Sequence, residues 1–192
     1  MNNIDIFLES VKNLQTVGTL AFSSKHLVKK MVEPIRFAEA RCIIELGTGN
    51  GCITRALLRR MKADTQLLSF EINDNFHRMT AAQLHDPRLR LINDSAENML
   101  PYIYESGFLY ADYIVSSVPL VSLPKQIEEN ILNSVLSTLK PKGLFVQFSY
   151  STILLKKIEQ TFGKKNVKVN FTPLNFPPAF IYVCKHNLNN TH

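Results

Sequence analysis

Three glycines at alternate positions, Gly47, Gly49 and Gly51, directly follow an apolar run that ends in Glu45 and Leu46. Such a run predicts a buried strand, and the glycines after it allow a tight turn into a helix. Backbone N–H groups at a turn of this kind can approach a nucleotide-like ligand closely. The first chemistry that the chain suggests is therefore ligand binding at a strand-to-helix turn.

The spacing of the glycines distinguishes between two classes of ligand. A dinucleotide-binding turn needs its third glycine five residues after the first, and that position is Cys52. In addition, a carboxylate at Glu45 would repel a pyrophosphate, whereas it suits a ligand that carries an ammonium and a sulfonium. These features predict binding of S-adenosylmethionine, which carries both cations.

Polar residues also follow the next three predicted strands. The strand over 66–71 ends in Glu71, at about the 20-residue distance from the glycines at which a carboxylate accepts both hydroxyls of a ribose. The short strand over 89–94 ends in Asp94. A fourth apolar strand, 113–115, runs into Ser116-Ser117-Val118-Pro119-Leu120. Taken singly, a glycine-rich turn can be ordinary loop chemistry, and each acid a solvated strand end.

Taken together and in this order, the four segments resemble the class I S-adenosylmethionine-dependent methyltransferases, whose first motif is an acid, any residue, and then Gly-x-Gly-x-Gly. The resemblance implies that Glu71 binds the ribose, that Asp94 contacts the adenine, and that the loop after the fourth strand faces the methyl group. It implies this donor, with S-adenosylhomocysteine as its product, and no metal. The cofactor-binding residues that it implies are Glu45, Gly47, Thr48, Gly49, Gly51, Glu71, Ile72, Asp94, Ser95 and Ser116.

The elements that must position these residues alternate along the chain. We expect strands over 42–46, 66–71, 89–93, 113–117, 144–148, 167–171 and 179–185, and helices over 52–61, 75–84, 97–104 and 124–139. The pattern predicts an α/β fold, a Rossmann-like three-layer sandwich with a seven-stranded, mostly parallel sheet and helices on both faces. By resemblance to the family, the last strand is antiparallel.

Residues 1–192 are expected to form a single methyltransferase domain, with a helical lead-in over 1–33, the Rossmann-like core over 41–185 and a disordered tail over 187–192. A hydrophobic content of 45% is sufficient for a full core. The three cysteines lack zinc-site spacing and are an odd number for a disulfide framework, which favours a reducing compartment. With no signal peptide or spanning apolar run, we expect a cytoplasmic protein, either soluble or peripheral at the inner membrane surface.

The loop after the fourth predicted strand bears on the methyl acceptor. Enzymes that methylate the amines of nucleic-acid bases typically carry Asn/Asp-Pro-Pro-aromatic there, or Asn-Leu-Pro-aromatic in the ribosomal RNA adenine dimethyltransferases, so that an amide accepts the amine hydrogens and a ring stacks on the base. This chain has Ser117-Val118-Pro119-Leu120 instead. Because both the amide and the ring are missing, the loop argues against a base as acceptor.

Three other segments resemble the bacterial phospholipid N-methyltransferases. Residues 17–24 resemble that family's Gly-x-x-x-Pro-Ser-Ser lead-in, with Phe22 in place of the proline. Residues 145–150 resemble its Gln-Phe-Thr-Tyr element, and residues 174–179 its Asn-Leu-Pro-Pro-Ala segment. The resemblance implies N-methylation of a phospholipid head-group amine, of the phosphatidylethanolamine type, at a membrane surface. No obligate protein partner is implied.

Three residues are the catalytic candidates for such a transfer. Tyr150 would accept an amine N–H or help to remove the proton, while Ser117 and the backbone around Pro119 would orient the amine. Two alternatives remain at this stage. One is methylation of an RNA adenine or of an amine on a small molecule or protein, and the other is a non-catalytic module that binds S-adenosylmethionine.

Charge does not separate a lipid surface from RNA. The net charge of +6 suits either kind of anionic partner. Cations clustered over 25–30 and 55–62 indicate either a solvated basic face or a binding patch. An apolar stripe lies near the N-terminus, and it predicts a helix that either lies in a membrane interface or caps the cofactor pocket. This stripe consists of Ile4, Phe7, Leu8, Val11 and Leu14.

Overall fold

The structure, a computed structural model, describes residues 24–187. The apolar stripe near the N-terminus, most of the segment 17–24 and residues 188–192 of the expected tail therefore lie outside the described residues. The expectations for these segments stay predictions.

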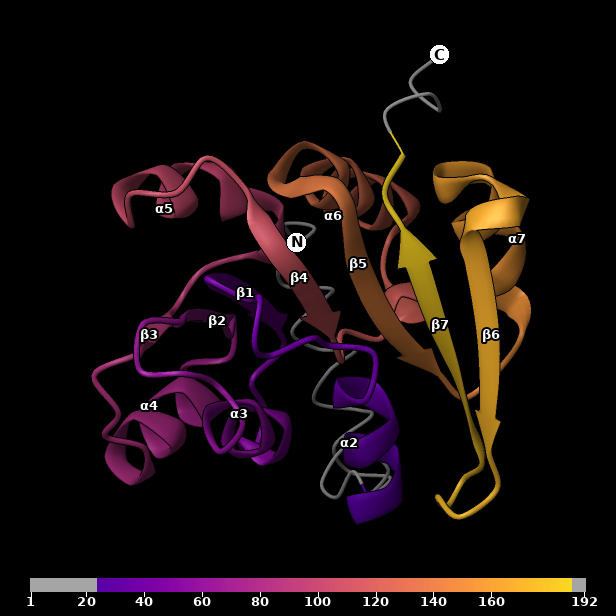
Figure 1. Ribbon diagram of the computed structural model, residues 1–192. Coiled ribbons are helices and arrows are strands. Elements are labelled where there is room, and N and C mark those ends of the chain that lie inside the picture. The colour runs from indigo at the N-terminus through magenta and orange to yellow at the C-terminus, as the bar shows by residue number, and fades with distance from the viewer. Residues whose placement is uncertain (1–23, 188–192) are drawn as a thin grey trace.

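In the described part of the chain, seven strands form one sheet in the order β3-β2-β1-β4-β5-β7-β6 (Figure 1). Strands β1 to β5 run parallel, and β7 pairs antiparallel with both β5 and β6. The predicted sheet, mostly parallel with an antiparallel last strand, is confirmed. The strands are β1 (Cys42–Leu46), β2 (Gln66–Phe70), β3 (Leu89–Ile92), β4 (Ala111–Ser116), β5 (Leu139–Ser149), β6 (Val167–Thr172) and β7 (Ala179–Lys185).

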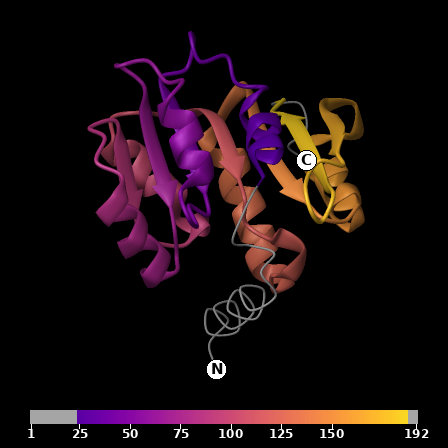
Figure 2. The same ribbon diagram turned by 90° about the horizontal axis from the view of Figure 1, so that it is seen from below.

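Helices cover both faces of this sheet, as predicted (Figures 1 and 2). One apolar core includes side chains of α5, α6 and α7, and a second includes side chains of α2 and α3. In β1, Ile44 belongs to the first core and its neighbour Ile43 to the second, because successive side chains of a strand point to opposite faces. The helices are α2 (Lys25–Val32), α3 (Cys52–Leu58), α4 (Asp74–Gln83), α5 (Met99–Glu105), α6 (Lys125–Thr138) and α7 (Ile153–Phe162).

Two elements differ from the expectation. Helix α7 was not predicted, although Leu154, Ile158 and Phe162 are buried at helical spacing and Gly163 follows the last of them. The predicted strand over 144–148 is also too short, because β5 begins at Leu139, directly after α6, and continues through Pro141 and Gly143 to Ser149.

The parallel strands β1 to β5 all end at one edge of the sheet. The glycine loop follows β1 at this edge, and the loops after β2, β3, β4 and β5 lie beside it. Ligand sites of open α/β sheets occur at this edge. None of the described helices is both long and apolar enough to cross a membrane.

Candidate functional site

The glycine loop after β1 has a backbone that requires glycine. Gly47, Gly49 and Gly51 have φ angles of +79°, +52° and +76°, which L side chains rarely adopt. The N–H groups of Gly47 and Thr48 both donate to the carbonyl oxygen of Phe70, at 2.9 and 3.2 Å, and attach the loop to β2. A Cβ atom at Gly47 would lie 2.9 Å from the hydroxyl oxygen of Ser117. The loop is thus held closely between β2 and the loop after β4.

Glu45 lies behind this loop, fully buried against α3. Its Oε2 atom accepts hydrogen bonds from the hydroxyls of Ser69 at 2.6 Å and Thr54 at 2.8 Å, and the Ser69 hydroxyl also contacts that of Thr48 at 2.6 Å. Burial raises the pKa of Glu45 to about 7, against the opposing effect of these two hydrogen bonds. Through the Ser69 hydroxyl, the Glu45 side chain is connected to Thr48 of the glycine loop. Its direct contact with the methyl donor stays a prediction.

Ionisation of Glu45 should be visible in the stability of the protein. Because its pKa is higher in the folded state than the ordinary 4.5, this group stabilises the fold fully below about pH 4.5, and that contribution disappears as the pH rises through about 7. The loss amounts to up to about 3 kcal/mol. Glu45→Gln removes the ionisation, so its free energy of unfolding should depend less on pH between pH 5 and 8 than that of the wild type. Denaturant titrations across this range measure the difference, and parallel pH profiles would contradict it.

Glu71, the predicted ribose ligand, connects the glycine loop to the loop after β2. Its Oε2 accepts the N–H of Gly49 and its Oε1 the N–H of Asn73, both at 2.8 Å. Burial raises the pKa of the Glu71 carboxyl, and the hydrogen bonds from Asn73 and Gly49 oppose this rise. Each carboxylate oxygen keeps a lone pair with which it can accept a ribose hydroxyl.

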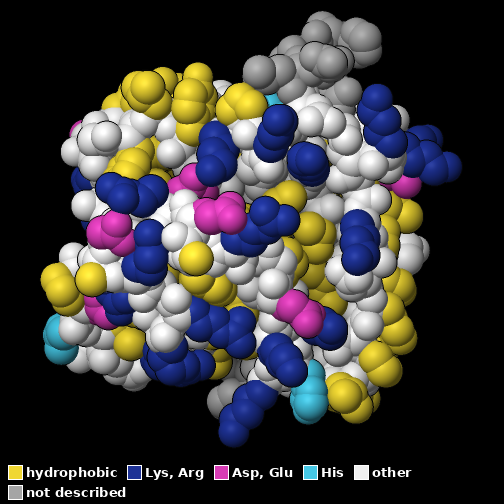
Figure 3. Space-filling model, in the orientation of Figure 1, with side chains coloured by type: hydrophobic (Ala, Val, Ile, Leu, Met, Phe, Trp, Pro, Cys, Tyr) yellow, Lys and Arg dark blue, Asp and Glu magenta, His cyan; other side chains and the backbone are white. Residues whose placement is uncertain are grey.

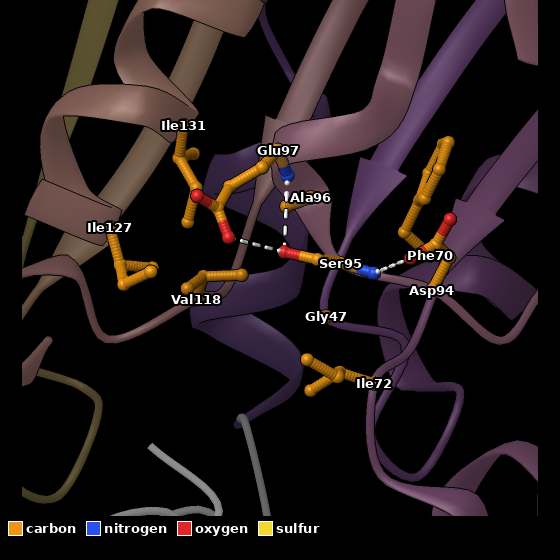
Figure 4. A pocket seen from close by; sticks show the side chains of 10 residues that line it. All are labelled: Gly47, Phe70, Ile72, Asp94, Ser95, Ala96, Glu97, Val118, Ile127 and Ile131. Atoms are coloured by element: carbon orange, nitrogen blue, oxygen red, sulfur yellow. Dashed lines mark hydrogen bonds between the residues drawn. The ribbon is translucent and has the colours of Figure 1, made fainter. Parts of the chain in front are cut away.

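A largely apolar pocket lies beside the loop, where residues from β2, the loops after β2, β3 and β4, and helix α6 converge (Figure 4). Four predicted cofactor residues line it: Gly47, Ile72, Asp94 and Ser95. The other lining residues are Phe70, Ala96, Glu97, Val118, Ile127 and Ile131. A flat apolar ring bordered by polar groups, such as adenine, suits a pocket of this composition.

Asp94 and Ser95 are held in place at the mouth of this pocket. Asp94 accepts hydrogen bonds from the Ser95 N–H, the Asn98 amide and the Tyr102 hydroxyl, at 2.6, 2.9 and 2.8 Å. Burial acts to raise the pKa of Asp94, but these three donors together lower it. The Ser95 hydroxyl donates to Glu97 at 2.9 Å (Figure 4). Sequence reasoning did not select Glu97.

A second pocket, of about 230 Å³, opens next to the first, and Val118 lines both. All three predicted catalytic residues, Ser117, Pro119 and Tyr150, line this second pocket, which we call the acceptor pocket. Its remaining lining residues are Val118, Leu120, Val121, Ser122, Phe148, Ser149, Ser151 and Leu154. The structure thus brings together the ends of β4 and β5, which are far apart in the sequence.

Hydrogen bonds fix the wall between the two pockets. The Ser117 hydroxyl donates to the carbonyl oxygen of Gly47 at 2.6 Å, and the fully buried Ser116 hydroxyl accepts the N–H of Val118 at 3.3 Å. Gln147, also fully buried, donates its amide to the carbonyl of Val118 at 3.0 Å. Gln147 was not selected from the sequence, although an amide in the middle of an apolar strand is a usable signal.

Tyr150 lies at the end of β5 and is connected to the hairpin between β6 and β7. Burial raises the pKa of Tyr150, and a side-chain hydrogen bond with Asn175 opposes the rise. Asn175 is itself buried, donates to the carbonyl of Pro177 at 2.7 Å and accepts the N–H of Ser24 at 3.1 Å. The phenol of Tyr150 is therefore neutral at physiological pH, which suits a hydrogen-bond acceptor better than a base. Asn175, which positions it, was not selected as a site residue.

Six of the predicted cofactor residues line neither pocket and lie behind or beside the glycine loop: Glu45, Thr48, Gly49, Gly51, Glu71 and Ser116. Among the residues that the structure describes, there is no group of three or more His, Cys, Asp or Glu side chains able to hold a metal ion.

Comparison with known proteins places this geometry in context. No family model matches the chain. The sequence is 27% identical over 187 residues to an ornithine lipid N-methyltransferase from Singulisphaera acidiphila, with 96% of this chain and 97% of the relative covered.

Two solved structures share the fold at low sequence identity. An O-methyltransferase from Bacillus cereus, in complex with S-adenosylhomocysteine, has a TM-score of 0.69 at 14% identity and covers 94% of this chain and 90% of its own. A precorrin-6y C5,15-methyltransferase from Geobacter metallireducens has a TM-score of 0.66 at 14% identity, over 86% of this chain and 90% of its own. These likenesses confirm the predicted fold. Because the two proteins are named for different acceptor atoms, the fold alone does not identify an acceptor.

Proposed function

We propose that this chain, a class I S-adenosylmethionine-dependent methyltransferase, methylates the primary amine of a lipid head group. The observation that carries the proposal is the acceptor pocket, in which Ser117, Pro119 and Tyr150 meet beside the cofactor-side pocket. The similarity to an ornithine lipid N-methyltransferase over nearly the whole of both chains supports a lipid amine. Phosphatidylethanolamine and an ornithine lipid both present a primary aliphatic amine, and the test below distinguishes them.

The described residues fit the methyl donor. The lining of the pocket of Figure 4 suits the adenine by its residue types, and its volume of about 30 Å³ means that the walls must move apart to admit the ring. The lone pairs of Glu71 suit the ribose hydroxyls. Gly47 lines the same pocket and leaves room for the donor, because it has no side chain. When bound, S-adenosylmethionine supplies a methyl group whose carbon–sulfur bond breaks as the acceptor nitrogen attacks, and S-adenosylhomocysteine remains.

The composition of the acceptor pocket favours a neutral amine. No charged side chain is among the described residues that line it. An ammonium group has no lone pair, and transfer into such surroundings lowers its pKa because the charged form is desolvated. The pocket thus promotes loss of the proton to water before attack, and no side chain with the pKa of a strong base is required.

Two hydroxyl groups can then orient the amine. The Ser117 hydroxyl hydrogen is engaged by the Gly47 carbonyl, so its oxygen has lone pairs left to accept an amine N–H. The neutral Tyr150 oxygen can accept a second N–H from the other side of the pocket. With two N–H groups held, the nitrogen lone pair stays free, and it can face the methyl group of a donor bound where the two pockets meet at Val118.

The proposal can be tested with labelled methyl donor. Purified protein is incubated with radiolabelled S-adenosylmethionine and, separately, phosphatidylethanolamine, an ornithine lipid and total RNA, with both lipids dispersed in detergent micelles. We expect label in one of the two lipids, and the more rapidly labelled lipid identifies the head group. Label confined to RNA would contradict the proposal and would favour the base-methylating alternative.

A further inference from the structure

Large apolar side chains are exposed in two segments next to Tyr150, which are the hairpin between β6 and β7, whose Asn175 hydrogen-bonds to Tyr150, and the start of α7. Phe176, in the hairpin between β6 and β7, is 96% exposed, and Leu174 in the same hairpin is 64% exposed. Ile153, the first residue of α7, is 79% exposed and follows shortly after the pocket residues Tyr150 and Ser151. Exposed apolar side chains beside a functional pocket indicate a surface that another apolar phase covers.

The hairpin holds these side chains outward through a buried polar residue. Asn175, between Leu174 and Phe176, is only 4% exposed and bonds inward to Pro177, Ser24 and Tyr150. These hydrogen bonds hold Asn175 against the body of the protein, and its neighbours Leu174 and Phe176 point into solvent. The same residue links the tip of the hairpin directly to the acceptor pocket.

Positive charge lies next to this tip. The Ser24 N–H that bonds to Asn175 immediately precedes α2, so Lys25 begins its helix beside the hairpin. Residues of α2 and α3 line a groove of about 370 Å³, and no acidic residue is among those that line it. Figure 3 shows the Lys and Arg side chains gathered over α2 and α3, with apolar side chains along the neighbouring edge. The cations of the groove are Lys25, Lys29, Arg55, Arg59 and Arg60.

We propose that this end of the molecule binds the surface of an anionic lipid bilayer. The apolar tip of the hairpin, Leu174 and Phe176, inserts between lipids at the level of the head groups, with Ile153 of α7 as a further apolar contact. The groove between α2 and α3 takes up lipid phosphates. Both contacts place the acceptor pocket against the head-group layer, so its substrate reaches Tyr150 without leaving the membrane. This inference rests on the proposed function and extends it to the form in which the substrate is presented.

The test compares vesicle binding with turnover in micelles. The full chain is sedimented with vesicles of phosphatidylcholine, with and without phosphatidylglycerol. The double variant Leu174→Ser/Phe176→Ser should bind the anionic vesicles about 10 to 100-fold more weakly, because it lacks the free energy gained when the two apolar side chains leave water for the bilayer. Its affinity for S-adenosylmethionine and its turnover on detergent-dispersed lipid should match the wild type, which shows that the fold is intact.

A matched control lies at the opposite edge of the sheet. Leu109 and Tyr110 precede β4 and are 72% and 49% exposed. The variant Leu109→Ser/Tyr110→Ser should bind vesicles as the wild type does. The variant Lys25→Glu/Lys29→Glu should lose the preference for phosphatidylglycerol, because it reverses the charge of the groove.

The possible outcomes separate the surface from the function. If Leu174→Ser/Phe176→Ser binds vesicles as strongly as the wild type, the insertion of the hairpin is overturned. This holds also when the remaining binding depends on charge alone and RNA competes with the vesicles. If the wild-type protein methylates micellar lipid but binds no vesicles, the proposed membrane-binding surface is overturned and the proposed function is retained. Vesicle binding that depends on the hairpin, in a protein that methylates no lipid, supports the surface and contradicts the function.

Discussion

Replacing Gly47 by alanine is expected to weaken the binding of S-adenosylmethionine by about 100-fold. A side chain at a φ of +79° costs about 1–2 kcal/mol, and the new Cβ would lie 2.9 Å from the Ser117 hydroxyl that binds the Gly47 carbonyl. Together these penalties reach about 3 kcal/mol, or about 100-fold in affinity. Because Gly47 lines the cofactor-side pocket, the loop of the variant relaxes away from this conformation, and the bound donor has to restore it at that cost. Isothermal titration calorimetry measures the affinity.

Gly107 offers a matched control for this substitution. Its φ is +80°, almost the same as that of Gly47, but a Cβ there would have no neighbour within 4 Å. Gly107→Ala should therefore lower the free energy of unfolding by the backbone penalty alone and leave the affinity for the methyl donor unchanged. Equal effects of the two substitutions on donor affinity would contradict the special role of the Gly47 contact.

The second large effect is expected at Tyr150. Tyr150→Phe should lower kcat on a lipid amine by about 10 to 100-fold, because one hydrogen bond that orients the nitrogen is worth about 1–3 kcal/mol. The ring remains, so its edge-to-face contact with Phe148, at 5.3 Å between ring centroids, is kept. The affinity for S-adenosylmethionine should not change, since Tyr150 lines only the acceptor pocket. Steady-state kinetics and calorimetry separate the two quantities.

Tyr104 provides the same chemical change away from the site. It is 53% exposed, lies on α5 and lines neither pocket. Tyr104→Phe should leave kcat unchanged. If Tyr150→Phe also leaves both turnover and donor affinity unchanged, Tyr150 has no part in the mechanism.

The sheet and the glycine loop could be predicted because their signals are local. A strand buried on both faces, such as β1, reads as a continuous apolar run, and a turn with positive φ angles requires glycines. The order of the strand ends then placed Asp94 and Ser117 at one edge of the sheet. Helix α7 has an equally local signal, since its apolar side chains recur at helical spacing, but this helix was not predicted.

The roles of individual side chains were harder to predict because they depend on contacts between distant segments. Glu45 is predicted as a ligand residue, and the sequence alone does not show that its carboxyl accepts hydrogen bonds from Thr54 of α3 and Ser69 of β2. Gln147 and Asn175 were not selected because their partners, Val118 and Tyr150, lie about 25 to 30 residues away and meet them only in the folded sheet. Motif order thus located the pockets, and the fold identified the residues that support their walls.

The central claim is that a methyl group passes from S-adenosylmethionine to a nitrogen atom of a lipid head group. Its most direct test uses a donor with a ¹³C-labelled methyl group, incubated with the protein and the preferred lipid in detergent micelles. Nuclear magnetic resonance of the extracted lipid then identifies the atom that received the label. The account predicts an N-methyl signal on the head-group amine. A labelled O-methyl or C-methyl group, or unlabelled lipid from protein that binds the donor, would contradict it.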